Sequence, residues 1–376
     1  MKFSFAALLF LFAASLGTSI IFYSELKHSQ RKIKTIAIDP NILQKKLASE
    51  PPTWMLKQIR SDLLHYSSGI SKSMIEEAFS GKKIEEFSLV RFTIKEGHIS
   101  FAHDEKQLNT RHFKELLGCI KKLNDTVPLP DVDFIVSLED GFGGNPGLGP
   151  CFVFAKKGDV DTLILIPDIK ALVGYTKLRK MIPQANEKFP WEKKLAKSFW
   201  RGSTTGGYST LTAWEHLVRA QLVLLSIAHP DKVDARFHAA VQCDPEVPLL
   251  LKAKGMMGKS VTKPGHLKFK YLVDVDGNSC SYERYFWLLL SNSLVLKQMT
   301  DNVQWYYGGL EPYKHFVPVK KDLSDLLDQI EWAKTHDMEA QLIAEEATQF
   351  VKDHLSPEDT ALYLYLLLNE YSRLQK

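Results

Sequence analysis

Short apolar runs that end near a carboxylate or a glycine recur along this chain, with helix-like segments between them. Three of these runs are residues 134–136, 162–166 and 267–275, and they lead into Asp140, Asp168 and Asp276. Alternation of buried strands with helices is typical of α/β layers, in which ligands bind at the carboxyl ends of the strands. The sequence therefore predicts an α/β fold with its functional residues at those ends.

Length and composition indicate a globular protein of two domains. The chain has 376 residues, of which 45% are hydrophobic and 24% charged, and its formal net charge is +4. These values exclude a disordered chain and a polytopic membrane protein. The positive charge forms no dense block, so nucleic acid is not an expected partner. At roughly 150 residues per domain, we expect one domain at 51–185, a second at 186–355 and a last helix at 356–376.

The N-terminus carries an uncharged stretch, residues 3–23, that is just long enough to span a bilayer. We interpret residues 1–24 as a signal anchor, with a cleaved signal peptide as the alternative, because the apolar run continues past the small residues at 13–15. Residues 25–50 then read as a polar stalk. Four cations follow the apolar run and favour a body on the cytoplasmic side; they are Lys27, Arg31, Lys32 and Lys34.

The chain has four cysteines, which could form two disulfides or remain four buried thiols. They are Cys119, Cys151, Cys243 and Cys280, and none has the spacing of a zinc site. The low count for this length favours buried thiols.

Local patterns predict a hairpin and several helices. Residues 87–94 alternate apolar and polar side chains, Gly97 turns the chain, and 99–101 can pair back as a second strand. Helices are predicted at about 112–123, 211–228 and 282–290. Ser356, followed by a proline and two acidic residues, is typical of a helix start.

Residues 201–207, RGSTTGG, form a candidate phosphate site. Small residues let backbone N–H groups converge, and the helix predicted to follow directly would add its dipole. The donors would come from Arg201 and from the hydroxyls of Ser203, Thr204 and Thr205, with Gly202 between them. No Gly-Lys-Ser/Thr ends the segment, so it is not a P-loop. The alternative interpretation is a flexible turn that caps a helix.

Two further arginines are candidates for binding an anion. Arg284 follows a strand and the turn Asp276-Gly277, close to the hydroxyl of Ser281. A guanidinium there can pair with a diphosphate in bidentate fashion, or else with a neighbouring acid such as Glu283. Arg219 lies in the apolar run 217–225, where a cation is costly unless it faces a ligand or a partner, or lies on the solvent side of its helix.

Asp140 is the candidate general base. It follows the buried run 134–136 and precedes a loop with five glycines, and a carboxylate at a strand end can take the proton of a hydroxyl. Glu139 is the rival, and the alternative is a turn-forming aspartate before glycine. The loop lacks the spacing of a dinucleotide fingerprint and contains Pro146, so we reject that interpretation.

Taken in order, these segments resemble glycosyltransferase family 90, which includes protein O-glucosyltransferases, fungal capsule xylosyltransferases and bacterial proteins of lipopolysaccharide modification. The resemblance covers roughly residues 85–372. The motifs that carry it are 199–206, 219–226, 229–235 and 268–277, Ser281 with Arg284, 293–297, and 315–319 with 322–325. Each motif alone is weak, and their shared order makes the resemblance specific.

The resemblance implies a GT-B fold, with two Rossmann-like domains facing a cleft and the last helix packing back on the first domain. It implies an inverting, metal-independent transfer, without a cofactor, from a UDP-sugar of glucose or xylose type. Its base maps to Asp140, because 134–140 and then 150–156 fit the family pattern. The donor would be held by residues 201–205, Arg219, Asp276, Gly277, Ser281 and Arg284, and no metal ligand is expected.

The acceptor is less defined than the donor. A hydroxyl on a glycan, a lipopolysaccharide or a protein fits, and the spacing from Asp276 to Arg284 resembles bacterial and plant members more than animal ones. Asn292 stands where the family usually has glycine. The resemblance leaves two settings: the cytoplasmic face of a bacterial inner membrane, which the flanking charges favour, or the lumen of the ER or Golgi. The alternative function is an inactive nucleotide-sugar-binding homologue.

Overall fold

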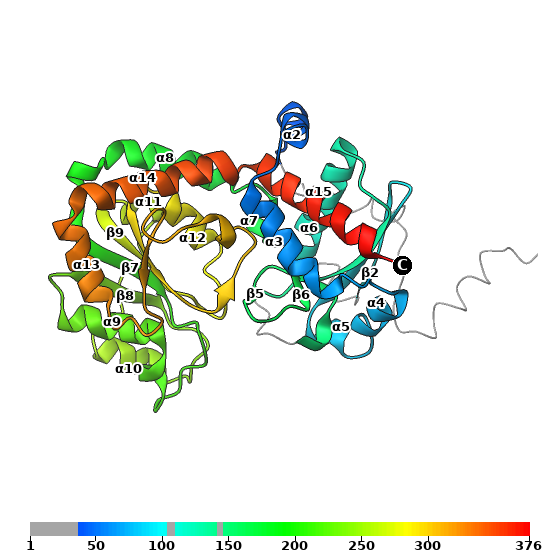
Figure 1. The fold of residues 1–376 in the computed structure, drawn as a ribbon. Coiled ribbons are helices and arrows are strands. Elements are labelled where there is room, and N and C mark those ends of the chain that lie inside the picture. The colour runs from blue at the N-terminus through cyan, green and yellow to red at the C-terminus, as the bar shows by residue number, and fades with distance from the viewer. Residues whose placement is uncertain (1–36, 104–109, 141–145) are drawn as a thin grey trace, which may run out of the picture. The chain divides into compact units, whose positions relative to one another are not determined.

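The computed structural model describes residues 37–103, 110–140 and 146–376, and it divides the chain into two compact units (Figure 1). The first unit comprises the described part of Met1–Gly174 with Val303–Tyr306 and Pro357–Lys376; the second comprises Tyr175–Asn302 and Tyr307–Ser356. The mixed α/β character predicted from the sequence is confirmed in both units.

The first unit is built on a five-stranded mixed sheet in the order β2-β1-β3-β4-β6. Its strands are β1 (Leu89–Lys95), β2 (His98–His103), β3 (Val132–Ser137), β4 (Cys151–Val153) and β6 (Leu163–Leu165). β1 pairs antiparallel with β2 and β3, whereas β4 is parallel to β3 and β6. The hairpin predicted at Gly97 is confirmed: Glu96 and Gly97 both have positive φ, 51° and 76°, as a two-residue hairpin turn requires.

Aromatic rings form the core of this unit. Phe134 stacks between Phe92 and Phe152, with centroid separations of 5.4 and 5.3 Å, and Tyr371 of the last helix meets Phe152 edge-on at 4.9 Å. Such contacts add to the free energy gained by burying the rings. The helices of the unit are α2 (Pro40–Leu47), α3 (Thr53–Leu63), α4 (Lys72–Ala78), α5 (Lys83–Glu86), α6 (Arg111–Thr126), α7 (Ile169–Leu172) and α15 (Pro357–Leu374).

The second unit is built on a five-stranded parallel sheet in the order β12-β10-β9-β7-β8. Its strands are β7 (Leu195–Ser203), β8 (Val233–Ala239), β9 (Phe269–Asp274), β10 (Leu294–Gln298) and β12 (Val317–Val319). Numbered along the chain, the spatial order is 2-1-3-4-5, a doubly wound sheet whose strand order reverses between β7 and β9. The carboxyl ends of those two strands are therefore the expected place for a ligand.

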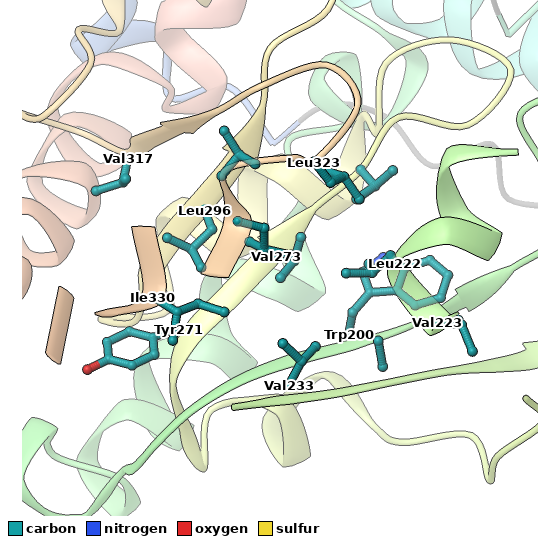
Figure 2. Close-up of a cluster of buried hydrophobic side chains, with 14 of the residues drawn as sticks. Trp200, Leu222, Val223, Val233, Tyr271, Val273, Leu296, Val317, Leu323 and Ile330 are labelled. Carbon is teal, nitrogen blue, oxygen red and sulfur yellow. The ribbon is translucent and has the colours of Figure 1, made fainter. Parts of the chain in front are cut away.

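Helices cover both faces of this sheet because successive side chains of β7 point to opposite sides. Trp200 packs into a core with Leu222 and Val223 of α9, which Figure 2 shows in close-up. Phe199 meets His266 of α11 on the other face. The helices are α8 (Thr176–Lys188), α9 (Val218–Ala228), α10 (Val247–Ala253), α11 (Lys263–His266), α12 (Glu283–Leu289), α13 (Leu326–Thr335) and α14 (Asp337–His354). The remaining strands among the described residues are β5 (Lys156–Lys157) and β11 (Asn302–Val303).

The first boundary between the units differs from the predicted one. The first segment of the first unit ends at Gly174. The helix α8, which the sequence placed mostly in the domain ending at residue 185, therefore belongs to the second unit. Two contacts explain this: Tyr175 stacks on Phe286 with a centroid separation of 3.8 Å, and Asn186 Nδ2 donates to the Leu290 carbonyl. The last helix, α15, falls in the first unit.

The N-terminal predictions fall partly outside the described residues. The anchor predicted at 1–24 and the first part of the stalk lie there. The described end of the stalk contains α2, whose Leu43 is fully buried and whose Lys46 pairs with Asp359 at 2.6 Å, so this part is a packed helix instead. Among the described helices, none combines the length and apolarity that crossing a membrane requires. The four cysteines are free thiols, three of them buried.

Candidate functional site

The carboxyl ends of β7 and β9 bring together two of the segments singled out in the sequence. The two strands are adjacent and parallel, so the loop after Ser203 and the turn at Gly277 emerge at the same edge of the sheet. Gly206 N donates to Asn278 Oδ1 at 3.1 Å and ties the loop to the turn. A Cβ at Gly277 would lie 3.0 Å from both Thr205 Oγ1 and Arg219 Nη2. The close approach of the two segments therefore favours glycine at position 277.

Arg219 clamps these two strand ends to each other. Its Nε donates to the Asp276 carbonyl at 2.9 Å and its Nη2 to the Val275 carbonyl at 3.1 Å, while its Nη1 donates to the Ser203 carbonyl at 3.2 Å and to Thr205 Oγ1. Burial and the nearby charge of Arg284 lower the pKa of Arg219 to about 10, so it stays charged at neutral pH. Most of its donors are thus used within the protein, and its charge remains available to attract an anion.

Arg284 is a buried guanidinium with a spare donor. It lies in the first turn of α12, and its Nη2 donates to the Arg201 carbonyl. Its Nη1 is buried and has no hydrogen-bond partner among the described residues. The guanidinium lies 5.8 Å from the centroid of the Trp200 ring, within range of a cation–π interaction. Burial lowers the pKa of Arg284. An unpaired buried donor on a cation is costly, so a ligand that accepts from it would be stabilised.

Arg201 shows the same pattern. Its Nη1 donates to the carbonyls of Trp200 and Asp234, and its Nη2 lies 2.8 Å from Asp234 Oδ1. The guanidinium stacks over Phe199 at 4.4 Å. Its Nε is buried without a partner in the described part of the chain.

Arg201 and Arg284 line one cavity of about 230 Å³. Lys263, His238 and His266 line it as well. Sites for drug-sized ligands measure roughly 300–1,000 Å³, so this cavity fits part of a larger ligand. Its cations and its unpartnered N–H groups suit an anionic group such as a phosphate.

Four of the predicted donor residues have internal roles. Thr204 Oγ1 donates to the Val241 carbonyl and accepts from the Val241 amide. The Asp276 carboxylate accepts from Thr300 and Asn302 and lies 3.3 Å from Lys297 Nζ; Ser281 Oγ donates to Asp274 at 2.6 Å. A Cβ at Gly202 would lie 2.2 Å from the Trp200 ring. These residues shape the strand ends that carry the arginines.

The helix expected directly after the glycine-rich loop begins later than predicted. α9 starts at Val218, and the segment before it runs beside the end of β8. Ser209 N donates to the Gln242 carbonyl at 2.8 Å, and a 3-10 turn, Trp214–His216, follows. The loop 203–207 is therefore not at a helix N-terminus, and the prediction that a helix dipole acts on a phosphate there is wrong.

Asp140 lies just beyond the end of β3 in the first unit. Its side chain is exposed and borders residues 141–145, which are outside the described residues. The rival, Glu139, accepts a hydrogen bond from Ser88 Oγ, and its amide donates to Ser137 Oγ at 3.3 Å. Both residues are exposed, and the carboxylate of Glu139 is engaged by Ser88. It belongs to the first unit, whereas the arginine cavity belongs to the second.

Sequence reasoning missed three contributors. His266 lines the cavity, Trp200 has both Arg219 and Arg284 within 6 Å of its ring centroid, and Lys297 pairs with two buried carboxylates at 3.2 and 3.3 Å. Trp200 stands inside the motif 199–206, and its position between Phe199 and Arg201 could have indicated it. No acidic residue or cysteine stands at a spacing from His266 that would have indicated a functional role. Within the described residues, no group of three or more His, Cys, Asp or Glu side chains is placed to hold a metal ion.

Comparison with known proteins identifies the family. The model of glycosyl transferase family 90 matches residues 49–376. The chain belongs to this family. That confirms the resemblance drawn from the ordered motifs, and the match extends further toward the N-terminus than the motifs did.

Three curated relatives of this chain are named protein O-glucosyltransferases. Human protein O-glucosyltransferase 3 is 31% identical over 354 residues, 90% of this chain and 64% of its own length. Protein O-glucosyltransferase 2 of Danio rerio is 29% identical over 85% of this chain and 62% of its own. The chain thus spans a little under two thirds of these two relatives. Human protein O-glucosyltransferase 1 is 27% identical over 84% of this chain and 79% of its own.

A solved structure, Anabaena HepE in complex with UDP-glucose, is 11% identical in sequence. The match covers 56% of this chain and 57% of that one. Its TM-score of 0.35 is too low to bear on fold or function.

Proposed function

We propose that this chain is an inverting glycosyltransferase with a GT-B arrangement, which moves a sugar of glucose or xylose type from a UDP-sugar to a hydroxyl acceptor. The observation that carries the proposal is the pair of unpartnered guanidinium nitrogens, Arg201 Nε and Arg284 Nη1, which line one cavity in the second unit. Family membership and the names of the relatives support the reaction class. They also favour a protein hydroxyl as the acceptor over a glycan or a lipopolysaccharide.

The donor diphosphate would occupy the arginine cavity. Arg201 and Arg284 would donate to its oxygens, and Arg219 would add positive charge from the strand ends. As the bond between the sugar and UDP breaks, negative charge builds on the departing UDP. Fixed cations therefore stabilise the transition state more than the ground state. Guanidinium groups can supply this stabilisation without a metal ion. Removal of one such donor costs about 2–4 kcal/mol at the transition state.

Asp140 would act as the general base. An acceptor hydroxyl must lose its proton as its oxygen attacks the anomeric carbon, and a carboxylate at a strand end can take that proton. The exposed position of Asp140 leaves it accessible to an acceptor. A single displacement then inverts the anomeric carbon, since the hydroxyl enters opposite the departing UDP.

The test is release of UDP from a panel of UDP-sugars with the full chain and acceptor peptides that carry serine or threonine hydroxyls. We expect Asp140→Asn to abolish turnover and to keep UDP affinity, whereas Arg284→Lys should weaken UDP binding. Glu139→Gln is the matched control, because this carboxylate is engaged by Ser88. Turnover that survives in Asp140→Asn would overturn the base assignment. UDP binding without turnover of any donor in the wild type would instead favour an inactive homologue.

A further inference from the structure

The hydrogen bonds of His266 fix which of its ring nitrogens carries the proton. His266 ends α11, and its side chain lies edge-on to Phe199 at 4.9 Å and to Trp287 at 5.2 Å. Its Nδ1 is 2.9 Å from the Thr262 carbonyl oxygen. A carbonyl oxygen can only accept, so Nδ1 must donate and carries the hydrogen. The other nitrogen, Nε2, then presents a lone pair as long as the ring is neutral.

The surroundings keep the ring neutral. Burial lowers the pKa of His266 to about 4, and the positive charges of Arg284, Arg201 and Lys263 act in the same direction. At neutral pH, Nε2 is therefore a hydrogen-bond acceptor beside a set of cations. This is the reverse of what a histidine in an anion site usually offers.

Nε2 is an acceptor that the protein does not satisfy. It is buried, and no described residue donates to it. The whole residue is 4% exposed and lines the same cavity as Arg201 and Arg284. The other charged groups there are already engaged with each other: Lys263 Nζ lies 2.6 Å from Glu283 Oε1. The cavity thus combines two unpartnered N–H donors with one unpartnered acceptor, and the ionised oxygens of a phosphate would satisfy only the donors.

We propose that His266 is a specificity-determining residue for the sugar donor: its Nε2 accepts a hydrogen bond from an N–H or O–H group that a nucleoside diphosphate carries outside its phosphates. The inference rests on the proposed function, because it assigns the anion in this cavity to a nucleotide. Two groups of UDP have the required chemistry: the ribose hydroxyls and the imide N–H of the uracil ring. Inorganic pyrophosphate has the anion without either.

The test compares the binding of UDP and pyrophosphate by calorimetry in three forms of the full chain. His266→Phe keeps an aromatic ring between Phe199 and Trp287 and removes the acceptor; His266→Gln keeps an acceptor. We expect His266→Phe to weaken UDP binding about 10- to 100-fold, because the ligand's donor is left unpaired, and to change pyrophosphate binding less than about twofold. His266→Gln should recover part of the UDP affinity. Equal losses for UDP and pyrophosphate, or no loss for UDP, would overturn the proposal.

A second arm varies the ligand, and its first comparison, made in the wild type, does not depend on whether a variant folds. 2′-Deoxy-UDP, 3′-deoxy-UDP and N3-methyl-UDP each remove one hydrogen-bond donor from the ligand. We expect one of them to bind about tenfold more weakly than UDP, and this loss should vanish in His266→Phe. If all three bind as UDP does, His266 accepts a hydrogen bond from none of these three groups, and the proposal is wrong. If the wild type binds no UDP at all, the proposed function itself fails, whereas turnover with unchanged discrimination in His266→Phe refutes only the role of His266.

Discussion

The buried ammonium group of Lys194 makes the stability of the second unit depend on pH. Lys194 is 5% exposed, and its Nζ donates to the carbonyls of Leu267 and Ser291 at 3.0 and 3.3 Å and to Ser293 Oγ at 2.8 Å. None of these partners is a carboxylate, and burial lowers the pKa of Lys194 from 10.5 to about 7. The folded unit therefore loses this proton near neutral pH, whereas the unfolded chain keeps it until about pH 10.5.

The direction of the effect follows from proton binding. Between the two pKa values the unfolded chain binds the additional proton, so the free energy of unfolding rises as pH increases through this window. One pKa unit corresponds to about 1.4 kcal/mol, which sets an upper limit of roughly 5 kcal/mol over the whole window. The three oxygens around Nζ favour the charged form, so we expect about 2–3 kcal/mol between pH 7 and pH 9.5. Below pH 7 both states hold the proton and this contribution to the slope disappears.

Lys194→Met removes the titrating group and keeps an unbranched apolar side chain. The assay is urea unfolding from pH 7 to pH 9.5, followed by tryptophan fluorescence, since most tryptophans of the chain lie in the second unit. The exposed Lys193→Met variant is the control. We expect wild type and Lys193→Met to gain stability relative to Lys194→Met as pH rises. A difference between wild type and Lys194→Met that stays constant over this range, or shrinks, would refute the reasoning.

Three further predictions concern the strand ends. Lys297→Met removes the cation that pairs with the buried carboxylates of Asp274 and Asp276, so thermal unfolding should show a loss of about 3–5 kcal/mol; a loss no larger than that of Lys321→Met, a surface control, would contradict this. Gly277→Ala places a Cβ 3.0 Å from Arg219 Nη2 and Thr205 Oγ1, and UDP affinity measured by calorimetry should fall with little change in melting temperature. An unchanged affinity would show that the clamp tolerates displacement. Arg219→Lys keeps the charge but cannot reproduce the bonds to both strand ends, so it should weaken UDP binding while pyrophosphate still binds; unchanged affinity for both ligands would mean that its charge alone matters.

The sequence predicted the elements whose determinants are local. The hairpin at Gly97 needs only two residues with positive φ between alternating strands, and both are present. In the second unit, β9 was visible as the apolar run 267–275 that leads into Asp276. The family followed from the order of the motifs, which no single one of them establishes.

The structure differs from the prediction where long-range contacts decide. The helix after the glycine-rich loop starts late because Ser209 is held beside β8 by a hydrogen bond to Gln242. The end of the predicted stalk is the helix α2, and its Lys46 pairs with Asp359, more than 300 residues away in the chain. Arg219 was predicted to contact a ligand, yet three of its nitrogens bind strand ends. The role of His266 could not be predicted from the sequence. It depends on the Thr262 carbonyl, which fixes the proton on Nδ1 and leaves Nε2 as the acceptor.

The central claim is that Arg284 binds a diphosphate while Asp140 takes a proton from the acceptor. The most direct test measures UDP affinity and UDP-sugar turnover together in Asp140→Asn and Arg284→Lys. We predict that Asp140→Asn binds UDP as the wild type does and turns over no donor. Arg284→Lys should bind UDP about 10- to 100-fold more weakly. Normal turnover in Asp140→Asn, or wild-type UDP affinity in Arg284→Lys, would contradict the claim.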